Sequence, residues 1–212
     1  MDFADQRRAY RKGALSDEAM ALDPLKMLVD WLHEARESGE PEGTAMALAT
    51  IDPDGGPSVR YVLCKGVTDR GIRFFTNLDS RKGIALAHEA RAAATFWWAG
   101  SERAARVRGT TVALPREEVD AYFASRPRGS RIGAWASDQS RPIESREALE
   151  AQAARIEAGF SDEEPTDAPE RWGGWELVAE EIELWQGRDD RLHDRLHFTR
   201  TETDWTAERL QP

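Results

Sequence analysis

Basic side chains beside helix-capping residue types make residues 60–82 the stretch of the sequence best suited to bind an anion. Arg60 and Lys65 flank an apolar run, and Arg81 and Lys82 follow directly after capping residue types at 77–80. A helix N-terminus presents unpaired N–H groups and a positive dipole end, so neighbouring cations there favour a phosphate. A surface hairpin with solvated charges explains the same spacing about equally well.

A second candidate anion site lies in the segment 122–130. Tyr122, Arg126 and Ser130 bring a phenol, a guanidinium and a hydroxyl within about two helical turns. Arg binds phosphate through two N–H groups at once, and the hydroxyls add directional donors. The alternative is a helix C-terminus at which Arg126 only complements the dipole.

The segment 185–195 places an indole before a dense run of arginine and histidine. Arg191, His193 and Arg195 are spaced two apart, so in an extended chain they would share one face and suit a planar ligand. A solvated turn in which aspartates pair with the arginines is the alternative. His193 and His197 have the spacing of a helical zinc pair, but an extended segment without a third ligand predicts no metal site.

Composition restricts the classes of function. A chain of 212 residues can bury a substantial core as one domain, or at most two small ones. The net charge of −10 argues against a nucleic-acid partner but leaves room for a local basic pocket. One cysteine, Cys64, excludes an intrachain disulfide and suits a reducing compartment. Without a membrane-spanning apolar run or a signal peptide, we expect a cytoplasmic protein with no membrane partner.

The hydrophobic pattern predicts an antiparallel sheet with helices inserted between its strands. Residues 1–22 are polar and are expected to form an arm, either mobile or ordered against another part of the chain. Strands and helices do not alternate as βαβ units would, which predicts an α+β fold around a barrel-like sheet. Helices are expected at 23–38, 82–89, 115–126, 132–136 and 146–160, and strands at 45–51, 58–66, 72–76, 92–98, 105–113, 175–186, 196–200 and 205–210.

Together these segments resemble the pyridoxine (pyridoxamine) 5′-phosphate oxidase family of FMN enzymes. The resemblance covers about residues 7–212 and rests on the ordered motifs RYVLCK, FFTNLDSRK, YFASRPRGSRIGAW, QS, IELWQG and RLHDR. It implies an FMN-binding split β-barrel with peripheral helices, and a homodimer in which both subunits build each active site. The arm 1–22 would precede one domain, 23–212, in which 171–212 serves dimerisation and the active site.

The resemblance also implies roles for individual residues. Arg191 and His193 would be catalytic and lie over the pyridine ring of the substrate, and Arg7 and Tyr10 would cover the bound product. Ala104 stands where the family usually has a flavin-contacting Gln. The substrate phosphate would be held by Lys65, Tyr122, Arg126 and Ser130. FMN would be held by Arg60, Lys65, Phe75, Thr76, Arg81, Lys82, Gln139, Ser140, Trp185 and Arg195.

The activity implied is oxidation of pyridoxamine or pyridoxine 5′-phosphate to pyridoxal 5′-phosphate, with O2 as acceptor and H2O2 as product. A related flavin oxidase that acts on dihydrophenazine-type metabolites is the second expectation. Such relatives tend to lack the phosphate-binding residues, so the presence of Lys65, Tyr122, Arg126 and Ser130 favours a phosphorylated pyridine. A protein that binds FMN or pyridoxal phosphate with little turnover is the third expectation, which Ala104 supports.

Overall fold

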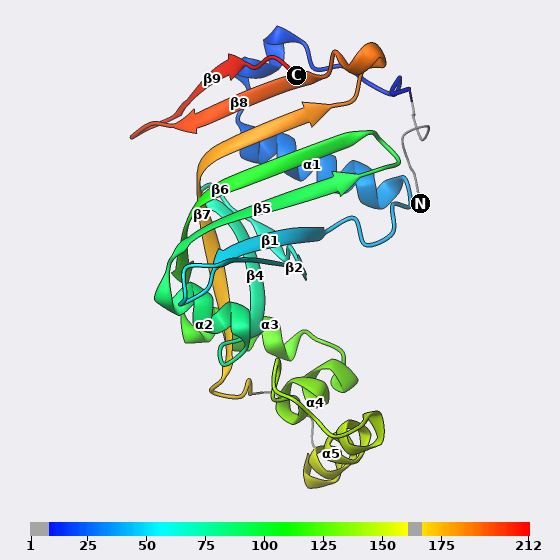
Figure 1. Ribbon diagram of the computed structural model, residues 1–212, viewed down its shortest axis with the longest axis vertical. Coiled ribbons are helices and arrows are strands. Elements are labelled where there is room, and N and C mark those ends of the chain that lie inside the picture. The colour runs from blue at the N-terminus through cyan, green and yellow to red at the C-terminus, as the bar shows by residue number, and fades with distance from the viewer. Residues whose placement is uncertain (1–8, 161–166) are drawn as a thin grey trace.

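The computed structural model describes residues 9–160 and 167–212, and its centre is a nine-stranded sheet (Figure 1). The strand order is β2-β1-β5-β6-β7-β4-β3, and β8 pairs with both β7 and β9. The strands are β1 (Ala45–Ile51), β2 (Pro57–Leu63), β3 (Gly66–Val67), β4 (Gly71–Asn77), β5 (Arg91–Trp98), β6 (Arg103–Ala113), β7 (Trp172–Gln186), β8 (Asp194–Arg200) and β9 (Trp205–Arg209).

The long strand β7 curls the sheet into a half-barrel. Its first part pairs with β4 and its last part with β8, while β6 runs antiparallel beside most of its length. The β6–β7 ladder is irregular between Arg108 and Gly109. A Cβ atom at Gly109 would lie 1.9 Å from the Val178 carbonyl oxygen, so the bend requires glycine there. This curled antiparallel sheet confirms the predicted α+β split barrel (Figure 1).

Helix α1 (Pro24–Glu37) shows how local sequence signals place an element on the core. Asp23 caps its N-terminus by accepting a hydrogen bond from the Leu25 N–H at 2.8 Å. Its apolar stripe, which includes Leu28 and Trp31, is buried against the concave sheet. The helix ends at Ser38, before Gly39 with a positive φ of 74°, as the sequence predicts.

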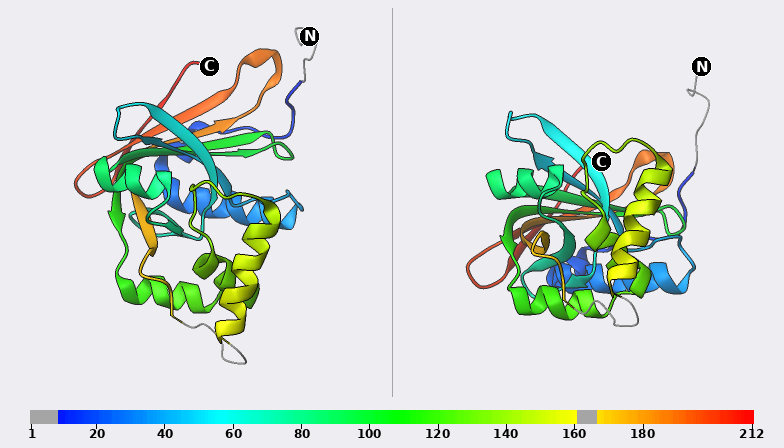
Figure 2. Two further views of the ribbon diagram at one scale, coloured as in Figure 1. Left: turned by 60° about the horizontal axis from the view of Figure 1, so that its bottom comes forward. Right: turned by 90° about the horizontal axis from the view of Figure 1, so that it is seen from below.

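The remaining helices frame the sheet where β4 pairs with β7. They are α2 (Arg81–His88), α3 (Arg116–Ala124), α4 (Arg128–Ala136) and α5 (Arg146–Phe160). Helix α4 packs against α5, and Figures 1 and 2 show α3, α4 and α5 together at the end of the molecule opposite the β8–β9 hairpin. Within the residues that the structure describes, no helix is long and apolar enough to cross a membrane.

Two sequence predictions are wrong in detail. The strand predicted over 58–66 is divided into β2 and β3, because Cys64 turns inward and its thiol donates to the Gly66 carbonyl at 3.3 Å. Arg191 is not extended: it ends a short 3-10 turn, Asp189–Arg191, with a φ of 63°. Strand β8 begins only at Asp194, so Arg191 does not share a strand face with Arg195. The predicted two-residue alternation therefore fails at the turn.

The described part of the N-terminal arm is ordered against the C-terminal strands, which was one of the two expectations. The backbone N–H groups of Arg11 and Lys12 donate to one oxygen of the buried Glu102 carboxylate at 2.7 and 3.0 Å. The Leu15 N–H donates to Asp194 at 3.0 Å. Arg7, predicted to cover the product, lies outside the described residues.

Candidate flavin and phosphate sites

The first half of the candidate site is a basic cavity at the start of α2. Ser80 caps this helix by accepting a hydrogen bond from the Gly83 N–H at 3.3 Å, which points the first turn at the cavity. Strand β2 contributes a third cation next to the two that open the helix. The cavity measures about 430 Å³ and is lined by Asp52, Ser58, Val59, Arg60, Tyr61, Arg81, Lys82, Gln139 and Ser140.

Neutral oxygens hold the cations of this cavity in place. The Lys82 ammonium donates to Thr76 Oγ1 at 3.0 Å and to Gln139 Oε1 at 2.8 Å. The Arg60 guanidinium donates to Ser58 Oγ at 2.6 Å and to Thr50 Oγ1 at 2.7 Å. Within the described part of the chain, neither cation forms an ion pair with a carboxylate. Asp52, which also lines the cavity, offsets part of the charge of Arg60, and three cations against this one carboxylate leave a net positive charge for a ligand.

The surroundings lower the pKa values of both Arg60 and Lys82. Burial lowers the pKa of Lys82, and the nearby charge of Arg60 lowers it further. Burial also lowers the pKa of Arg60. A dianionic phosphate would reverse these effects, because it favours the charged form of each group. The residues present therefore fit the phosphate of FMN.

Sequence reasoning missed two residues that position the Arg60 side chain at this cavity. Thr50 and Ser58 orient the Arg60 guanidinium, and they face each other across the β1–β2 hairpin. Ser58 could have been found, since it lies two residues before Arg60 and so shares its strand face. The role of Thr50 can be inferred only once the register of the β1–β2 hairpin is known.

The second half of the candidate site surrounds Arg126. The Tyr122 ring stacks on Phe75 of β4 with centroids 3.8 Å apart and 15° between the planes. The Arg126 guanidinium lies 4.3 Å from the centroid of Trp172 and 5.6 Å from that of Phe123. Its Nη1 atom is buried, and no described residue forms a hydrogen bond with it. Burial lowers the pKa of Arg126 and raises that of Tyr122. Trp172 was not anticipated from the sequence.

The other two predicted phosphate ligands are placed differently. Ser130 lies in the first turn of α4, where it is exposed, and a break at Ser125–Pro127 separates this helix from α3. Lys65 follows β2 and lines another cavity, of about 560 Å³, together with His33 and Arg36 of α1. The structure thus brings Tyr122 and Arg126 together and leaves Lys65 beside α1.

A third cluster gathers around His193 at the far end of β7. The imidazole lies 4.7 Å from Trp185 and 5.7 Å from Tyr10, measured between ring centroids. Its Nδ1 accepts a hydrogen bond from the Arg188 backbone N–H at 3.1 Å, so in the neutral form the proton sits on Nε2. Burial lowers the pKa of His193, and the charge of Arg191 lowers it further. The imidazole is thereby kept neutral with an N–H to donate.

We expect Arg191→Gln to raise the pKa of His193, because it removes a like charge that disfavours the imidazolium. An NMR titration of the His193 ring protons would measure the change. Arg36→Gln, on exposed α1 surface, also removes one positive charge and should leave the His193 titration unchanged. A His193 pKa that stays constant or falls in Arg191→Gln would contradict the electrostatic explanation.

Trp185 belongs to a row of outward-facing residues across four strands. Trp97 is opposite Ala104, Ala104 is opposite Trp185, and Trp185 is opposite Arg195. The two indoles lie 5.7 Å apart between centroids, so they meet beside the small Ala104 side chain. Arg195 donates to both oxygens of Glu183 at 3.0 and 2.9 Å, and its role toward FMN stays a prediction.

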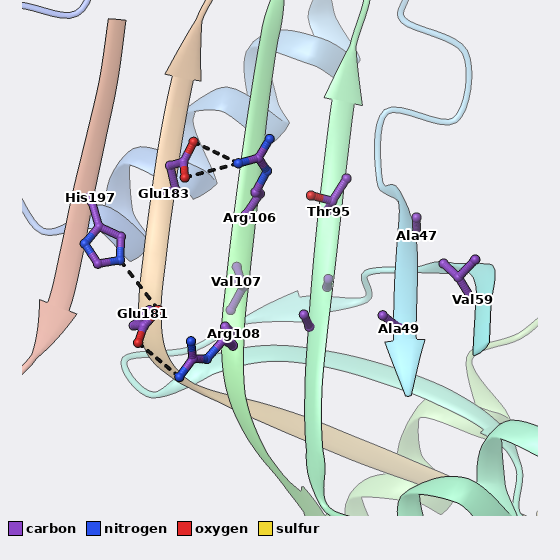
Figure 3. Close-up of a pocket in the computed structure, with 12 residues that line it drawn as sticks. Ala47, Ala49, Val59, Thr95, Arg106, Val107, Arg108, Glu181, Glu183 and His197 are labelled. Atoms are coloured by element: carbon purple, nitrogen blue, oxygen red, sulfur yellow. Dashed lines mark hydrogen bonds and ion pairs between the residues drawn. The ribbon is translucent and has the colours of Figure 1, made fainter. Parts of the chain in front are cut away.

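Below this row, the outward sheet face carries a cavity of about 420 Å³ (Figure 3). Small side chains such as Ala47 and Ala49 line it on β1. Ion pairs cross it on the other side: Arg106 with Glu183 at 3.1 Å, and Arg108 with Glu181 at 3.2 Å. Its lining contains none of the residues predicted to bind FMN or substrate. Within the described residues, no group of three or more His, Cys, Asp and Glu side chains could hold a metal.

Strand β7 separates the predicted site residues of one chain into two sets. Thr76, which touches Lys82, is paired with Gly173, and Arg195 is paired with Trp185. These two positions on β7 are twelve residues apart, roughly 40 Å along the strand at about 3.3 Å per residue. Figure 1 shows α2 and α3 well away from the β8 end of the sheet. Because β7 is curled, the straight-line distance is shorter than this path, but the two sets lie toward opposite ends of the strand.

Comparison with known families agrees with this architecture. Residues 32–159 match the family described as pyridoxamine 5′-phosphate oxidase. Residues 172–212 match the pyridoxine 5′-phosphate oxidase C-terminal dimerisation region. The second match contains β8, β9 and the turn that carries His193.

Individual relatives are similar over the whole chain. The pyridoxine/pyridoxamine 5′-phosphate oxidase of Cupriavidus necator is 48% identical over 211 residues, which cover 99% of each chain. The protein of the same name from Salinibacter ruber is 45% identical over 212 residues, again 99% of each chain.

Two solved structures show the same fold. PhzG from Burkholderia lata, in complex with tetrahydrophenazine-1-carboxylic acid, superposes with a TM-score of 0.86 at 31% identity and covers 95% of this chain and 100% of its own. A pyridoxamine 5′-phosphate oxidase-related, FMN-binding protein from Nostoc punctiforme superposes with a TM-score of 0.72 at 18% identity and covers 91% and 100%. The chain therefore belongs to the pyridoxine/pyridoxamine 5′-phosphate oxidase family of FMN-dependent oxidoreductases, with its split-barrel fold and its dimerisation region.

Proposed function

We propose that this protein oxidises pyridoxamine 5′-phosphate and pyridoxine 5′-phosphate to pyridoxal 5′-phosphate, with O2 as electron acceptor and H2O2 as product. The relatives that are 45–48% identical over their full length carry the corresponding name. The observation that carries the proposal is the buried Nη1 atom of Arg126, which has no hydrogen-bond partner among the described residues, on a guanidinium whose charge acts on the Tyr122 phenol. A phosphate is the ligand that such a pair recognises best.

A buried guanidinium nitrogen without a partner costs free energy, roughly 1–3 kcal/mol or more when the group is charged. A buried polar group without a partner calls for an explanation, such as a functional role or a bound ion. Here the aromatic rings of Trp172 and Phe123 pack against the guanidinium and hold it beside Tyr122. The arrangement is therefore suited to a phosphate ester, and less to an uncharged ring.

Each active site is proposed to lie between two subunits. Arg60, Lys82 and Arg126 would come from one protomer, and Arg191 and His193 would come from its partner's copy of the 172–212 region. The separation of these sets along β7 within one chain supports this arrangement, as does the match to a dimerisation region. A second copy would bring the neutral His193 imidazole to a ligand seated on Arg126.

The residues of this chain mainly bind and orient the reactants. Bound FMN supplies the acceptor for the hydride that leaves the C4′ carbon of the substrate. Arg60, Arg81 and Lys82 would fix the cofactor phosphate, and Arg126 with Tyr122 would fix the substrate phosphate. Nε2–H of His193 and the Arg191 guanidinium would orient the pyridine ring. No strong protein base is required for this chemistry.

Peroxide formation tests the proposal. The purified protein, supplied with FMN, should release H2O2 with pyridoxamine 5′-phosphate and should use unphosphorylated pyridoxamine far less efficiently. Equal values of kcat/KM for the ester and the free amine would overturn the assignment of Tyr122 and Arg126 to the substrate phosphate. A flavoprotein that binds the ester but releases no peroxide would instead support the low-turnover binding protein.

The structure of PhzG with a bound tetrahydrophenazine favours a second candidate function, oxidation of a dihydrophenazine-type tricycle. The sheet fold and the His193 turn suit either substrate, since both are planar. Charge distinguishes them by degree, because the tetrahydrophenazine carboxylic acid carries a single carboxylate, whereas a phosphate ester carries up to two negative charges for Arg126 to bind. Peroxide release from a reduced phenazine at a kcat/KM above that for pyridoxamine 5′-phosphate would establish this second function.

We expect the protein to purify as a yellow dimer with one FMN per subunit. The basic cavity at α2 predicts the bound cofactor, and the dimerisation region predicts the two subunits. Absorbance in the flavin bands after gel filtration, together with the mass from light scattering, would measure it. A colourless monomer that stays colourless and monomeric after addition of FMN would contradict both the cofactor site and the composite active site.

A further inference from the structure

Helix α3 rests on strand β4 through two contacts one helical turn apart. Glu118 forms an ion pair with Arg73, whose Nη1 lies 2.5 Å from Glu118 Oε2. Tyr122 stacks on Phe75 with ring centroids 3.8 Å apart. The spacings match, because residues i and i+4 of a helix rise by about 6 Å and residues i and i+2 of a strand by about 6.6 Å.

Arg73 is itself fixed to the sheet by a buried carboxylate. Its Nε donates to Glu176 Oε1 at 3.1 Å, and Glu176 is 4% exposed at its side chain. The same oxygen accepts from Thr68 Oγ1 at 2.7 Å, and Arg70 lies 3.5 Å from the other oxygen. One arginine thus links strands β4 and β7 to helix α3.

Several contacts fix the first turn of helix α3. Its N-cap, Pro115, provides no side-chain cap, but Arg116 donates to the Pro169 carbonyl at 3.2 Å and Val119 is buried. The contact of Glu118 with Arg73 adds an ion pair that ties this helix directly to β4 and so helps to set its rotation. Arg126 lies two residues after the end of α3, where its N–H donates to the Phe123 carbonyl at 3.1 Å, so a shift of α3 would also move its guanidinium over Trp172.

From this geometry we infer that Arg73 and Glu118 are positioning residues for the substrate-phosphate seat formed by Tyr122 and Arg126. They act through the rotation of α3, at a distance from the ligand. This inference rests on the proposed function, because it assumes that the seat holds the phosphate of the substrate. It adds two residues, on a strand and a helix, whose loss should affect the ester and spare the free amine.

Glu118→Ala is the primary test, with Glu117→Ala as matched control. Glu117 is an exposed neighbour in the same helical turn, so the control removes the same charge without the contact to Arg73. For Glu118→Ala we expect the KM for pyridoxamine 5′-phosphate to rise about twofold to fivefold, the range of a partly exposed ion pair. The dissociation constant of pyridoxal 5′-phosphate, titrated by absorbance, should rise by the same factor. The kinetic constants for unphosphorylated pyridoxamine and the affinity for FMN should stay as in the control.

A second variant separates positioning from general loss of structure. Glu118→Gln can still accept a hydrogen bond from Arg73, so it should restore most of the affinity for the ester. If Glu118→Ala lowers kcat/KM for ester and free amine equally, the ion pair only stabilises the fold and the inference fails. If Glu118→Ala behaves like Glu117→Ala on an enzyme that prefers the ester, the inference also fails. A wild-type enzyme without preference for the ester refutes the proposed function itself.

Discussion

Arg126→Ala should raise the KM for pyridoxamine 5′-phosphate by roughly tenfold to a hundredfold while the protein keeps its FMN. A charge-assisted contact to phosphate is worth about 1.5–3 kcal/mol, and each 1.4 kcal/mol is about tenfold in affinity. The value of kcat should change less, since a phosphate remote from the reacting carbon contributes mainly uniform binding. In the proposed arrangement other cations, Arg60 and Lys82, hold the FMN phosphate, so cofactor content should not fall.

Arg128→Ala is the matched control for Arg126→Ala. Arg128 lies two residues further along and forms an ion pair with Glu157 of α5, so it is engaged away from the seat. Its loss should leave the KM for the ester near the wild-type value. Arg126→Lys should fall between wild type and Arg126→Ala, because lysine keeps the charge and loses the planar pair of donors. Steady-state kinetics with pyridoxamine and its phosphate ester on all four proteins measures the effect.

The outcome also decides between the two candidate substrates. If the natural substrate is an unphosphorylated tricycle, Arg126→Ala should hardly matter for it, and wild type should not distinguish pyridoxamine from its ester. That result would remove the phosphate role from Tyr122, Arg126 and Ser130 together. The buried, unpaired Nη1 atom would then need another ligand.

The sequence predicts the elements of this fold well where the signals are local. Asp23 and Pro24 mark the start of α1, and Ser80 caps α2 just before the two cations that face the cavity. Both features depend on residues within one helical turn, so no tertiary information is needed. The anion cavity at α2 could therefore be anticipated from residue types and spacing, apart from its partners on other strands.

Features that depend on distant residues could not be derived in this way. The two-residue spacing of 191, 193 and 195 suggests an extended chain, but positive φ angles at Asp190 and Arg191 turn the backbone before β8 begins. Trp172 meets Arg126 only because β7 returns beside α3 after a long connection. Lys65 shares a motif with Arg60, yet the break between β2 and β3 leaves it beside α1.

Lys82→Ala should weaken FMN binding by about tenfold to a hundredfold. The ammonium is one of three cations at the cavity, and each charge-assisted phosphate contact contributes about 1.5–3 kcal/mol. Arg60→Ala should have an effect of the same size, but it also removes the hydrogen bonds that Thr50 and Ser58 accept from the guanidinium. Lys82→Ala is therefore the cleaner variant. Fluorescence titration of apoprotein with FMN measures the dissociation constant, and Lys26→Ala on exposed α1 surface is the control.

The stability of the apoprotein distinguishes a ligand role for Lys82 from a structural one. Burial and the charge of Arg60 both lower the pKa of Lys82, so its charged form is disfavoured while the cavity holds no anion. Removing the ammonium should therefore leave the Tm of the apoprotein nearly unchanged, although its hydrogen bonds to Thr76, Ser80 and Gln139 are lost. The increase in Tm on adding FMN should shrink, because stabilisation by a ligand follows its affinity.

The lowered pKa of Lys82 adds a pH dependence of known sign. As pH rises toward that pKa the ammonium loses its proton, so FMN affinity of the wild type should fall on the alkaline side. Lys82→Arg keeps a charge at all such pH values and should flatten this decline. Unchanged FMN affinity in both Lys82→Ala and Arg60→Ala would instead mean that the cofactor phosphate binds elsewhere, and the basic cavity at α2 would lose its assigned ligand.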